Sequence, residues 1–274
     1  MSRRVSRRGA ALLAALAALA AASGCREDGD PAPYGLIWQD EFTGPAGLLP
    51  DSTRWRCDLG TDWGNGQLEY DTDRPQNASL DGEGHLAITA RREDYAGQSY
   101  TSGRLTTRGL FEQTRGRFEA RIQLPVGQGL WPAFWLLGAD IDRVGWPQCG
   151  EIDVMEYRGQ EPRVLHGSLH GPGYSGGGAL TSSHVLAQGG FDLGFHEFAV
   201  EWNEEAITWL VDGYAYFTAA PADLPPGTNW VFDHPFFIIL NVAVGGRWVG
   251  APDETTAFPQ TMLVDYVRVY GPLP

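Results

Sequence analysis

Hydrophobic and polar residues alternate along much of the chain beyond residue 34. The stretch 117–124 places an apolar side chain at every second position, from Phe118 to Leu124. Because strand side chains point alternately to two faces, this pattern predicts one buried and one solvated face, as in an antiparallel sheet. Helical periodicity is almost absent, and Gly, Pro, Asp and Asn turns separate the runs. We expect further strands at residues 86–90, 151–157, 198–202, 207–211, 236–244 and 263–270.

The fold class follows from the number of such strands and from the turns between them. Asp212-Gly213 separates two of the apolar runs and predicts a tight β-hairpin. Many short strands together with 36 Gly and 18 Pro favour an all-β sandwich or jelly roll. No internal repeat or change of composition divides residues 34–274, so we expect a single domain there.

Charge excludes several classes of function. The net charge of the chain is −14, and without the first 24 residues 34 acidic side chains face 16 arginines, a net charge of −18. Such an acidic chain is a poor ligand for a phosphate backbone, so no nucleic-acid partner is expected. All 20 basic residues are Arg, which excludes a Schiff-base lysine and a P-loop lysine.

The N-terminus has the pattern of a targeting segment. Four arginines within the first eight residues precede an apolar run that is too short for a comfortable membrane span, so residues 1–24 predict a signal peptide. Cys25 follows Ser-Gly as in a bacterial lipoprotein processing site, but the usual leucine three positions earlier is an alanine. Lipidation and plain cleavage therefore both stay open, with residues 25–33 as a polar tether. We expect a protein that is secreted or lipid-anchored at the bacterial surface or periplasm, touching membrane only through Cys25.

The other two cysteines, Cys57 and Cys149, do not make a disulfide scaffold. They could pair in an oxidising compartment, but sequence does not show their proximity.

Three carboxylates fall within six residues of an apolar, β-branched run at Glu151, Asp153 and Glu156. Strict alternation places the first two on one face and Glu156 on the other, so a β-bulge near Met155 is needed to bring all three together. With that bulge we expect the two glutamate carboxyls on the order of 5–6 Å apart, near the spacing of retaining glycosidases. A calcium site or a solvated acidic strand is the alternative, which the apolar neighbours disfavour.

Aromatic residues surround this acidic segment in the sequence. Ten Trp are present, and Trp131, Trp135 and Trp146 flank the acids, while Trp248 lies in a Gly-rich loop. Flat aromatic faces stack on the C–H faces of sugar rings, although each of these side chains is also suited to core packing.

The order of these motifs resembles the laminarinase-like branch of glycoside hydrolase family 16 over nearly all of residues 36–270. A short Glu-x-Asp-x-x-Glu would be a weak signal alone, whereas many motifs in one order are specific. The resemblance rests on Trp38-Gln39-Asp40-Glu41-Phe42, Trp63-Gly64-Asn65-Gly66-Gln67-Leu68-Glu69-Tyr70, Ser102-Gly103-Arg104, Gly129-Leu130-Trp131-Pro132-Ala133-Phe134-Trp135, Glu151-Ile152-Asp153-Val154-Met155-Glu156, His170-Gly171, Gly245-Gly246-Arg247-Trp248 and Val264-Asp265-Tyr266-Val267-Arg268.

The resemblance implies a β-jelly-roll of two curved antiparallel sheets with a concave cleft for a β-glucan. It implies Glu151 as nucleophile, Asp153 as helper and Glu156 as acid/base in an endo-acting, retaining hydrolysis of β-1,3-glucan or β-1,3/1,4-glucan through a covalent glycosyl-enzyme. No cofactor is required for this chemistry, and a monomer is expected. For substrate contacts we predict Asn65, Arg104, Trp131, Trp135, His170 and Trp248.

A structural Ca²⁺ is a further expectation carried by the resemblance. Asp265 would supply a carboxylate, and the backbone at Glu41 and Gly82 would add oxygens, the ligands that Ca²⁺ prefers. Two alternatives to a β-glucanase remain: a hydrolase of another polysaccharide such as agar or carrageenan, and a non-catalytic β-glucan-binding protein on the same fold. The Gly- and Ser-rich segment 171–190, interpreted as a mobile cleft edge or a disordered flap, could shift specificity.

Overall fold

Strands pair into two sheets within residues 34–272, the part of the chain that the computed structural model describes. All pairs are antiparallel except β3 with β6. The ten-stranded sheet contains β1 (Tyr34–Asp40), β3 (Glu69–Asp71), β4 (Ala78–Leu80), β5 (Leu86–Tyr95), β6 (Gln98–Ser102), β8 (Gly116–Gln123), β13 (His196–Trp202), β14 (Ile207–Val211), β15 (Tyr214–Ala219) and β17 (Gln260–Pro272). The seven-stranded sheet runs in the order β12 (Leu180–Val185), β11 (Val164–His170), β10 (Glu151–Tyr157), β9 (Leu130–Gly138), β16 (Phe236–Val244), β7 (Arg104–Thr106) and β2 (Arg56–Cys57).

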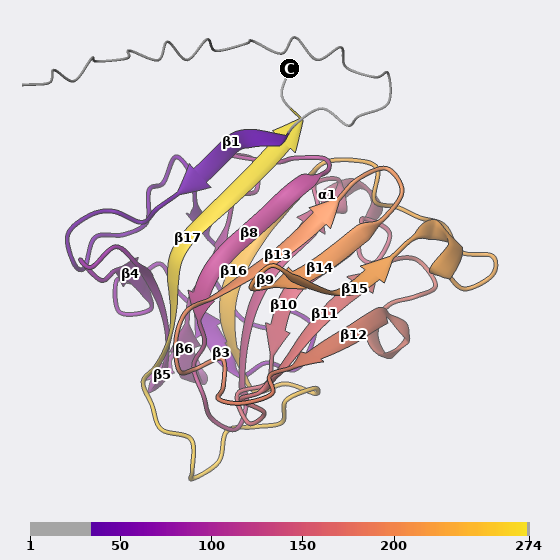
Figure 1. Cartoon of the computed structure of the whole chain (residues 1–274). Coiled ribbons are helices and arrows are strands. Elements are labelled where there is room, and N and C mark those ends of the chain that lie inside the picture. The colour runs from indigo at the N-terminus through magenta and orange to yellow at the C-terminus, as the bar shows by residue number, and fades with distance from the viewer. Residues whose placement is uncertain (1–33, 273–274) are drawn as a thin grey trace, which may run out of the picture. The chain divides into compact units, whose positions relative to one another are not determined.

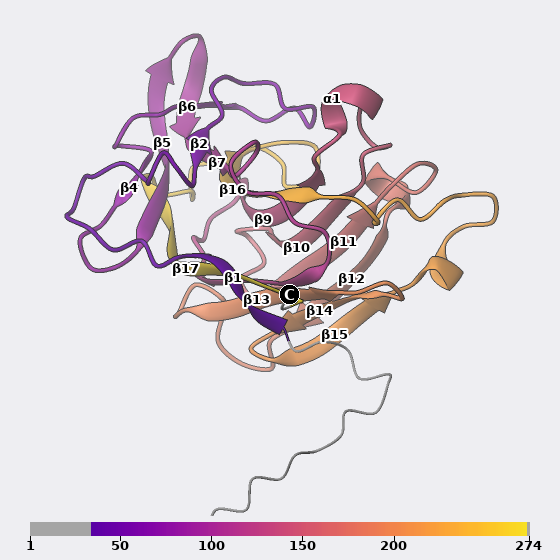
Figure 2. The same cartoon turned by 90° about the horizontal axis from the view of Figure 1, so that it is seen from above.

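The two sheets lie face to face and enclose the core (Figure 1). Figure 2 shows the same two layers from above, with β13 and β14 in one and β9, β10 and β11 in the other. Trp202 on β13 meets Phe236 on β16 edge to face between the sheets, with ring centroids 5.2 Å apart. Both side chains are fully buried, and burial of each large apolar side chain contributes about 1.5–3 kcal/mol. The predicted all-β sandwich is thus confirmed, and the second sheet's outer face is left free to carry a site.

Each of the seven strand ranges predicted from the hydrophobic pattern falls on a strand of the structure: β5, β8, β10, β13, β14, β16 and β17. The predicted hairpin joins β14 to β15, and its two turn residues have positive φ, 49° at Asp212 and 76° at Gly213. Such values suit a type I′ turn, whose twist matches that of the flanking strands. Helix in the described residues is limited to α1 (Ile141–Val144) and to the 3₁₀ turns η1 (Gly176–Gly178) and η2 (Pro221–Asp223).

Residues 171–190 were interpreted as a mobile cleft edge or a disordered flap, and the disordered flap is wrong for residues 180–185. Residues 180–185 form β12, an edge strand that pairs with residues 164–169 of β11. Its exposed and half-buried positions alternate strictly. The strand is polar because only one of its faces is covered, so composition alone resembles that of a loop.

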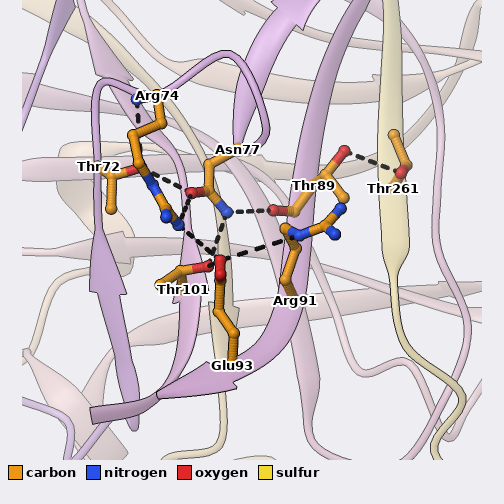
Figure 3. Close-up of polar contacts among 8 residues, drawn as sticks. All are labelled: Thr72, Arg74, Asn77, Thr89, Arg91, Glu93, Thr101 and Thr261. Atoms are coloured by element: carbon orange, nitrogen blue, oxygen red, sulfur yellow. Dashed lines mark hydrogen bonds and ion pairs between the residues drawn. The ribbon is translucent and has the colours of Figure 1, made fainter. Parts of the chain in front are cut away.

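A cluster of polar side chains holds β6, the strand that precedes Arg104 in the sequence (Figure 3). Arg74 and Thr101 both donate to the same carboxylate oxygen of Glu93, over 2.5 Å in each case. The amide of Asn77 donates to the carbonyl of Thr89 and to the hydroxyl of Thr101, over 3.0 Å each. These bonds tie the turn before β4 to the β5–β6 hairpin. Since β6 is followed almost at once by β7, the cluster fixes the backbone from which Arg104 projects.

The predicted signal peptide at residues 1–24, the tether at 25–33 and the acylation site Cys25 lie outside the described residues. Within residues 34–272, no helix is long and apolar enough to cross a membrane. Cys57 and Cys149 are free thiols. Burial raises the pKa of Cys57 to about 11 and that of Cys149 to about 12, so neither is activated as a nucleophile.

Candidate active site

The predicted bulge is present in β10. Asp153 pairs with Trp135 on β9, but the very next β9 residue, Phe134, pairs with Met155. Val154 is therefore the extra residue, and it turns into the core together with Met155, both almost fully buried. Glu156 is thereby returned to the outer face of the sheet.

The three acids lie at the floor of a cleft of about 440 Å³. Glu151, Asp153 and Glu156 all line it, so the structure brings the predicted catalytic residues together. Other lining residues include Trp63, Asn65, Gln67, Arg104, Arg108, Trp131, Trp135, Trp146, Phe237 and Asn241. A largely apolar cavity with a few convergent polar groups is the usual form of a ligand site.

Glu156 is held by two neighbours. The indole nitrogen of Trp131 donates to one carboxylate oxygen over 3.0 Å, and the Ser168 hydroxyl lies 3.4 Å from the other. Trp131 in turn packs against Trp248, with ring centroids 5.1 Å apart. Trp248 is not among the residues that line the cleft, so its contact with substrate stays a prediction.

His170 lies beside the other two acids. Its Nε2 is 3.0 Å from a carboxylate oxygen of Asp153 and 3.8 Å from Glu151. The backbone N–H of Gly176 donates to Nδ1 over 3.1 Å, which places the ring proton on Nε2, facing the acids. His170, which was predicted to contact substrate, is not among the residues that line the cleft and instead lies beside two of the acids.

The same three residues are also the candidate metal ligands of the described chain. Glu151, Asp153 and His170 each offer one ligand atom, all within 4.8 Å of one another. The Gly176 contact favours a proton on the histidine nitrogen that a metal would need, so the arrangement fits a proton-sharing cluster better than a metal centre.

Burial perturbs the protonation of all three acids. It raises the pKa of Glu156 to about 8, and the negative charge of Asp153 adds to the effect. It raises the pKa of Asp153 to about 8 as well. Burial and the charge of Asp153 also hold the pKa of Glu151 well above its usual range. The cluster therefore retains protons at neutral pH, and the remaining charge is shared among coupled carboxyls.

Arg104 lies between two tryptophan rings on the cleft wall. Its guanidinium carbon is 4.6 Å from the centroid of Trp63 and 4.8 Å from that of Trp135. Asp58 accepts from its Nε over 2.9 Å. This stack holds the guanidinium rigidly, with a planar set of donors beside the cavity.

Asn241 is a site residue that the sequence pattern alone could have indicated. It is the single polar residue in the nine-residue apolar strand β16. Its side-chain oxygen accepts from the indole nitrogen of Trp135 over 2.8 Å, which fixes the ring at the cleft floor. A lone polar side chain in a fully buried strand needs a partner, and here that partner is a substrate-binding candidate.

A second buried acid pair was not foreseen. Glu69 and Asp71 on β3 are almost fully buried, and neither was predicted to be a site residue. Glu69 accepts from the backbone N–H of Val244 over 2.7 Å, and Asp71 accepts from the indole of Trp63 over 2.8 Å. The pair thereby connects the cleft wall at Trp63 to the end of β16.

Stability should fall with rising pH because of this pair. Burial raises the pKa of Glu69 to about 8 from an ordinary value of 4.5, and that of Asp71 to about 7. Between those values the folded protein holds protons that the unfolded chain has lost, so the free energy of unfolding decreases as pH rises. Glu69→Gln is expected to flatten the fall of the thermal midpoint between about pH 5 and about pH 8, whereas exposed Glu83→Gln leaves it unchanged. Equal slopes in both variants and wild type would contradict this origin.

The carboxylate that was expected to bind calcium, that of Asp265, is paired with an arginine. The carboxylate of Asp265 pairs with the guanidinium of Arg121, and that of Glu41 accepts two bonds from Arg268, over 2.8 and 2.9 Å. Gly82 lies in the turn after β4 with φ of 85°. A guanidinium at Asp265 does not fit a cation there, so the carboxylate that the expectation relied on is not available as arranged. A measurement of the metal content of the purified protein tests whether Ca²⁺ is bound.

Comparison with known proteins identifies relatives over most of the chain. Residues 60–268 match the sequence profile of Glycosyl hydrolases family 16. A β-glucanase of Rhodothermus marinus is 41% identical over 98% of this chain and 96% of its own. The clotting factor G alpha subunit of Tachypleus tridentatus is 38% identical over 86% of this chain, which spans only 34% of that larger protein. The laminarinase catalytic domain of Thermotoga maritima MSB8 superimposes with a TM-score of 0.83 at 47% identity, covering 88% of this chain and 99% of that one.

Proposed function

Because this chain belongs to glycosyl hydrolase family 16, we propose that it is an endo-acting enzyme that hydrolyses β-1,3-glucan or mixed β-1,3/1,4-glucan with retention of anomeric configuration. The observation that carries the proposal is the bulge in β10, which puts Glu151, Asp153 and Glu156 on one face at the floor of an aromatic cleft. A protein that only binds glucan has no need of three buried acids, which are costly unless they are used.

The reaction has two displacement steps. The ionised carboxylate of Glu151 attacks the anomeric carbon, the glycosidic C–O bond breaks, and Glu156 gives its proton to the departing oxygen. Glu156, now ionised, takes a proton from water, which attacks the anomeric carbon and releases Glu151. Asp153 and the Nε2–H of His170 beside it set the charge that Glu151 carries. These roles are assigned by the family resemblance, and the geometry supports them.

A substrate panel tests the assignment. Initial rates on laminarin, lichenan, agarose and carboxymethyl-cellulose, with chromatography of the products, are expected to show oligosaccharides from laminarin and, at lower or similar rate, from lichenan. Activity confined to agarose would overturn the glucanase assignment, and binding of laminarin without any cleavage would favour the recognition protein.

The pH dependence of kcat/KM should be bell-shaped. Glu156 must be protonated, so activity is present below its pKa and is lost as pH rises through about 8. Glu151 must be ionised, which places the acid limb at the lower macroscopic ionisation of the cluster. Rates on laminarin measured across the pH range check both limbs. An alkaline limb near the ordinary pKa of a surface glutamate would show that the acid is not buried as described.

We also propose that the protein is exported and acts as a monomer outside the cytoplasm. The charged and apolar pattern of residues 1–24 supports export, and Cys25 is the candidate for lipid attachment. Mass spectrometry of the mature N-terminus distinguishes an acylated Cys25 from plain cleavage, and light scattering of the purified protein determines the oligomeric state.

A further inference from the structure

One carbonyl of the catalytic strand is bound from the opposite sheet. Trp209 on β14 is fully buried, and its indole nitrogen donates to the main-chain oxygen of Asp153 over 2.7 Å. Asp153 is the residue after which the register of β10 shifts against both of its neighbouring strands. A bulge interrupts the ladder, and a buried carbonyl left without a donor is unfavourable. Trp209 supplies that donor from the core side.

Strand β11 has a glycine, and so no side chain, at the position beside the bulge where the Trp209 indole lies. On β11, Ser168 pairs with Asp153 and His166 pairs with Glu156, so Gly167 between them faces the bulge. A Cβ at Gly167 would lie 2.6 Å from Cδ1 and 2.9 Å from Nε1 of the Trp209 ring. Any side chain there would push the indole away, so the glycine provides the space that this contact needs.

Neighbouring aromatic residues hold the ring in place. Phe217 on β15 stacks on Trp209 with centroids 4.6 Å apart and planes 28° from parallel. The pairing of β15 with β14 has its own irregularity next to Trp209, which leaves Tyr216 as an extra residue. The Tyr216 hydroxyl occupies the same open position, 2.5 Å from where a Cβ of Gly167 would stand.

We propose that Trp209 is a positioning residue for the reaction: by binding the Asp153 carbonyl it holds the bulge, and the bulge keeps Glu156 on the face of Glu151. This inference rests on the proposed function, since it concerns the spacing of the acids in that reaction. Trp209 does not line the cleft. Its influence therefore passes through the backbone of β10 and leaves the substrate-binding walls, including Arg104, unchanged.

Trp209→Phe removes the donor and keeps an aromatic ring in the core. The matched control is Trp202→Phe, because the indole of Trp202 is also buried and also donates to one backbone oxygen, that of Phe232 over 3.3 Å, which does not belong to β10. Both variants lose one hydrogen bond and a similar apolar volume. Their thermal midpoints are expected to fall by similar amounts.

The kinetic readouts separate positioning from stability. For Trp209→Phe we expect kcat on laminarin to fall by about 10- to 100-fold with KM within about twofold of wild type, since small displacements of reacting groups are costly. The alkaline limb of kcat should move to lower pH, because a relaxed strand turns Glu156 toward water and away from the charge of Asp153. For Trp202→Phe we expect kcat and the pH profile of wild type.

Equal kcat and equal pH profiles in the two variants, at equal loss of stability, would overturn the inference while the wild-type activity still supported the proposed function. If Trp209→Phe does not fold, Gly167→Ala displaces the same indole by its added methyl group and is expected to show the same split between kcat and KM. Wild-type kinetics in a folded Gly167→Ala variant would then contradict the role. Absence of hydrolysis by the wild type would instead refute the proposed function.

Discussion

Replacement of Glu151 by alanine is expected to lower kcat on laminarin by at least about 10⁴-fold, because it removes the group that forms the covalent intermediate. Glu151 lines the cleft, and its carboxylate lies close to Asp153 and His170, with one ligand atom of each of the three residues within 4.8 Å of the others. Initial rates measured with purified protein and reducing-sugar detection check the loss. Glu205→Ala, at an exposed position, is the control and should retain wild-type activity.

Addition of azide to the Glu151→Ala variant tests whether Glu151 acts as the nucleophile. The alanine leaves space on the side from which the carboxylate attacked. Azide can form its C–N bond to the anomeric carbon there, while Glu156 still protonates the departing oxygen. The expected product from a β-linked aryl glycoside is the α-glycosyl azide, identified by NMR. Residual activity within tenfold of wild type, or a β-glycosyl azide, would show that Glu151 is not the nucleophile.

Replacement of Glu156 by glutamine should give the second large effect, a fall of kcat/KM on laminarin of about 10²–10⁴-fold. The amide keeps the shape of the side chain near Trp131 and Ser168 but has no proton to donate to the leaving oxygen. An aryl glycoside with a good leaving group needs no such proton, so cleavage of its first bond should be affected much less. The alkaline limb of the pH profile should disappear with the group that causes it.

The role of Glu156 is tested by comparing the loss of rate on laminarin with the loss on the activated aryl glycoside. An equal loss on laminarin and on the activated glycoside would mean that Glu156 supports the structure of the cleft and does not act as the acid. Ser168→Ala is a useful companion variant, since it removes the weaker of the two contacts to this carboxyl and should change rates far less.

The sequence could predict that the three acids share one face of the strand, because their spacing departs from strand alternation at a single point. Two acids spaced by two residues and a third spaced by three require one extra residue, and the apolar residues between them had to turn inward together. The structure bears this out at Val154 and Met155. The strand and its bulge could therefore be predicted from the hydrophobic pattern, and the cleft residues from the family resemblance.

Other parts of the site depend on contacts that alternation does not encode. Pro132 lies within β9, a central strand, where a missing N–H normally argues against a strand. Glu69 is held by Val244 at the end of β16, more than a hundred residues away in the sequence. Asp71 is held by Trp63, which lies a few residues before it. Trp209 contacts the bulge across the sandwich, and no local pattern distinguishes it from an ordinary core tryptophan.

The anomeric configuration of the first product tests the account most directly. In ¹H NMR spectra recorded during early hydrolysis of laminarin, before mutarotation equilibrates the sugar, the new reducing end should appear first as the β-anomer. That result requires cleavage of a β-linked glucan by double displacement, the chemistry assigned to Glu151 and Glu156. First appearance of the α-anomer would contradict the retaining geometry of the three acids, and absence of any new reducing end would contradict the glucanase itself.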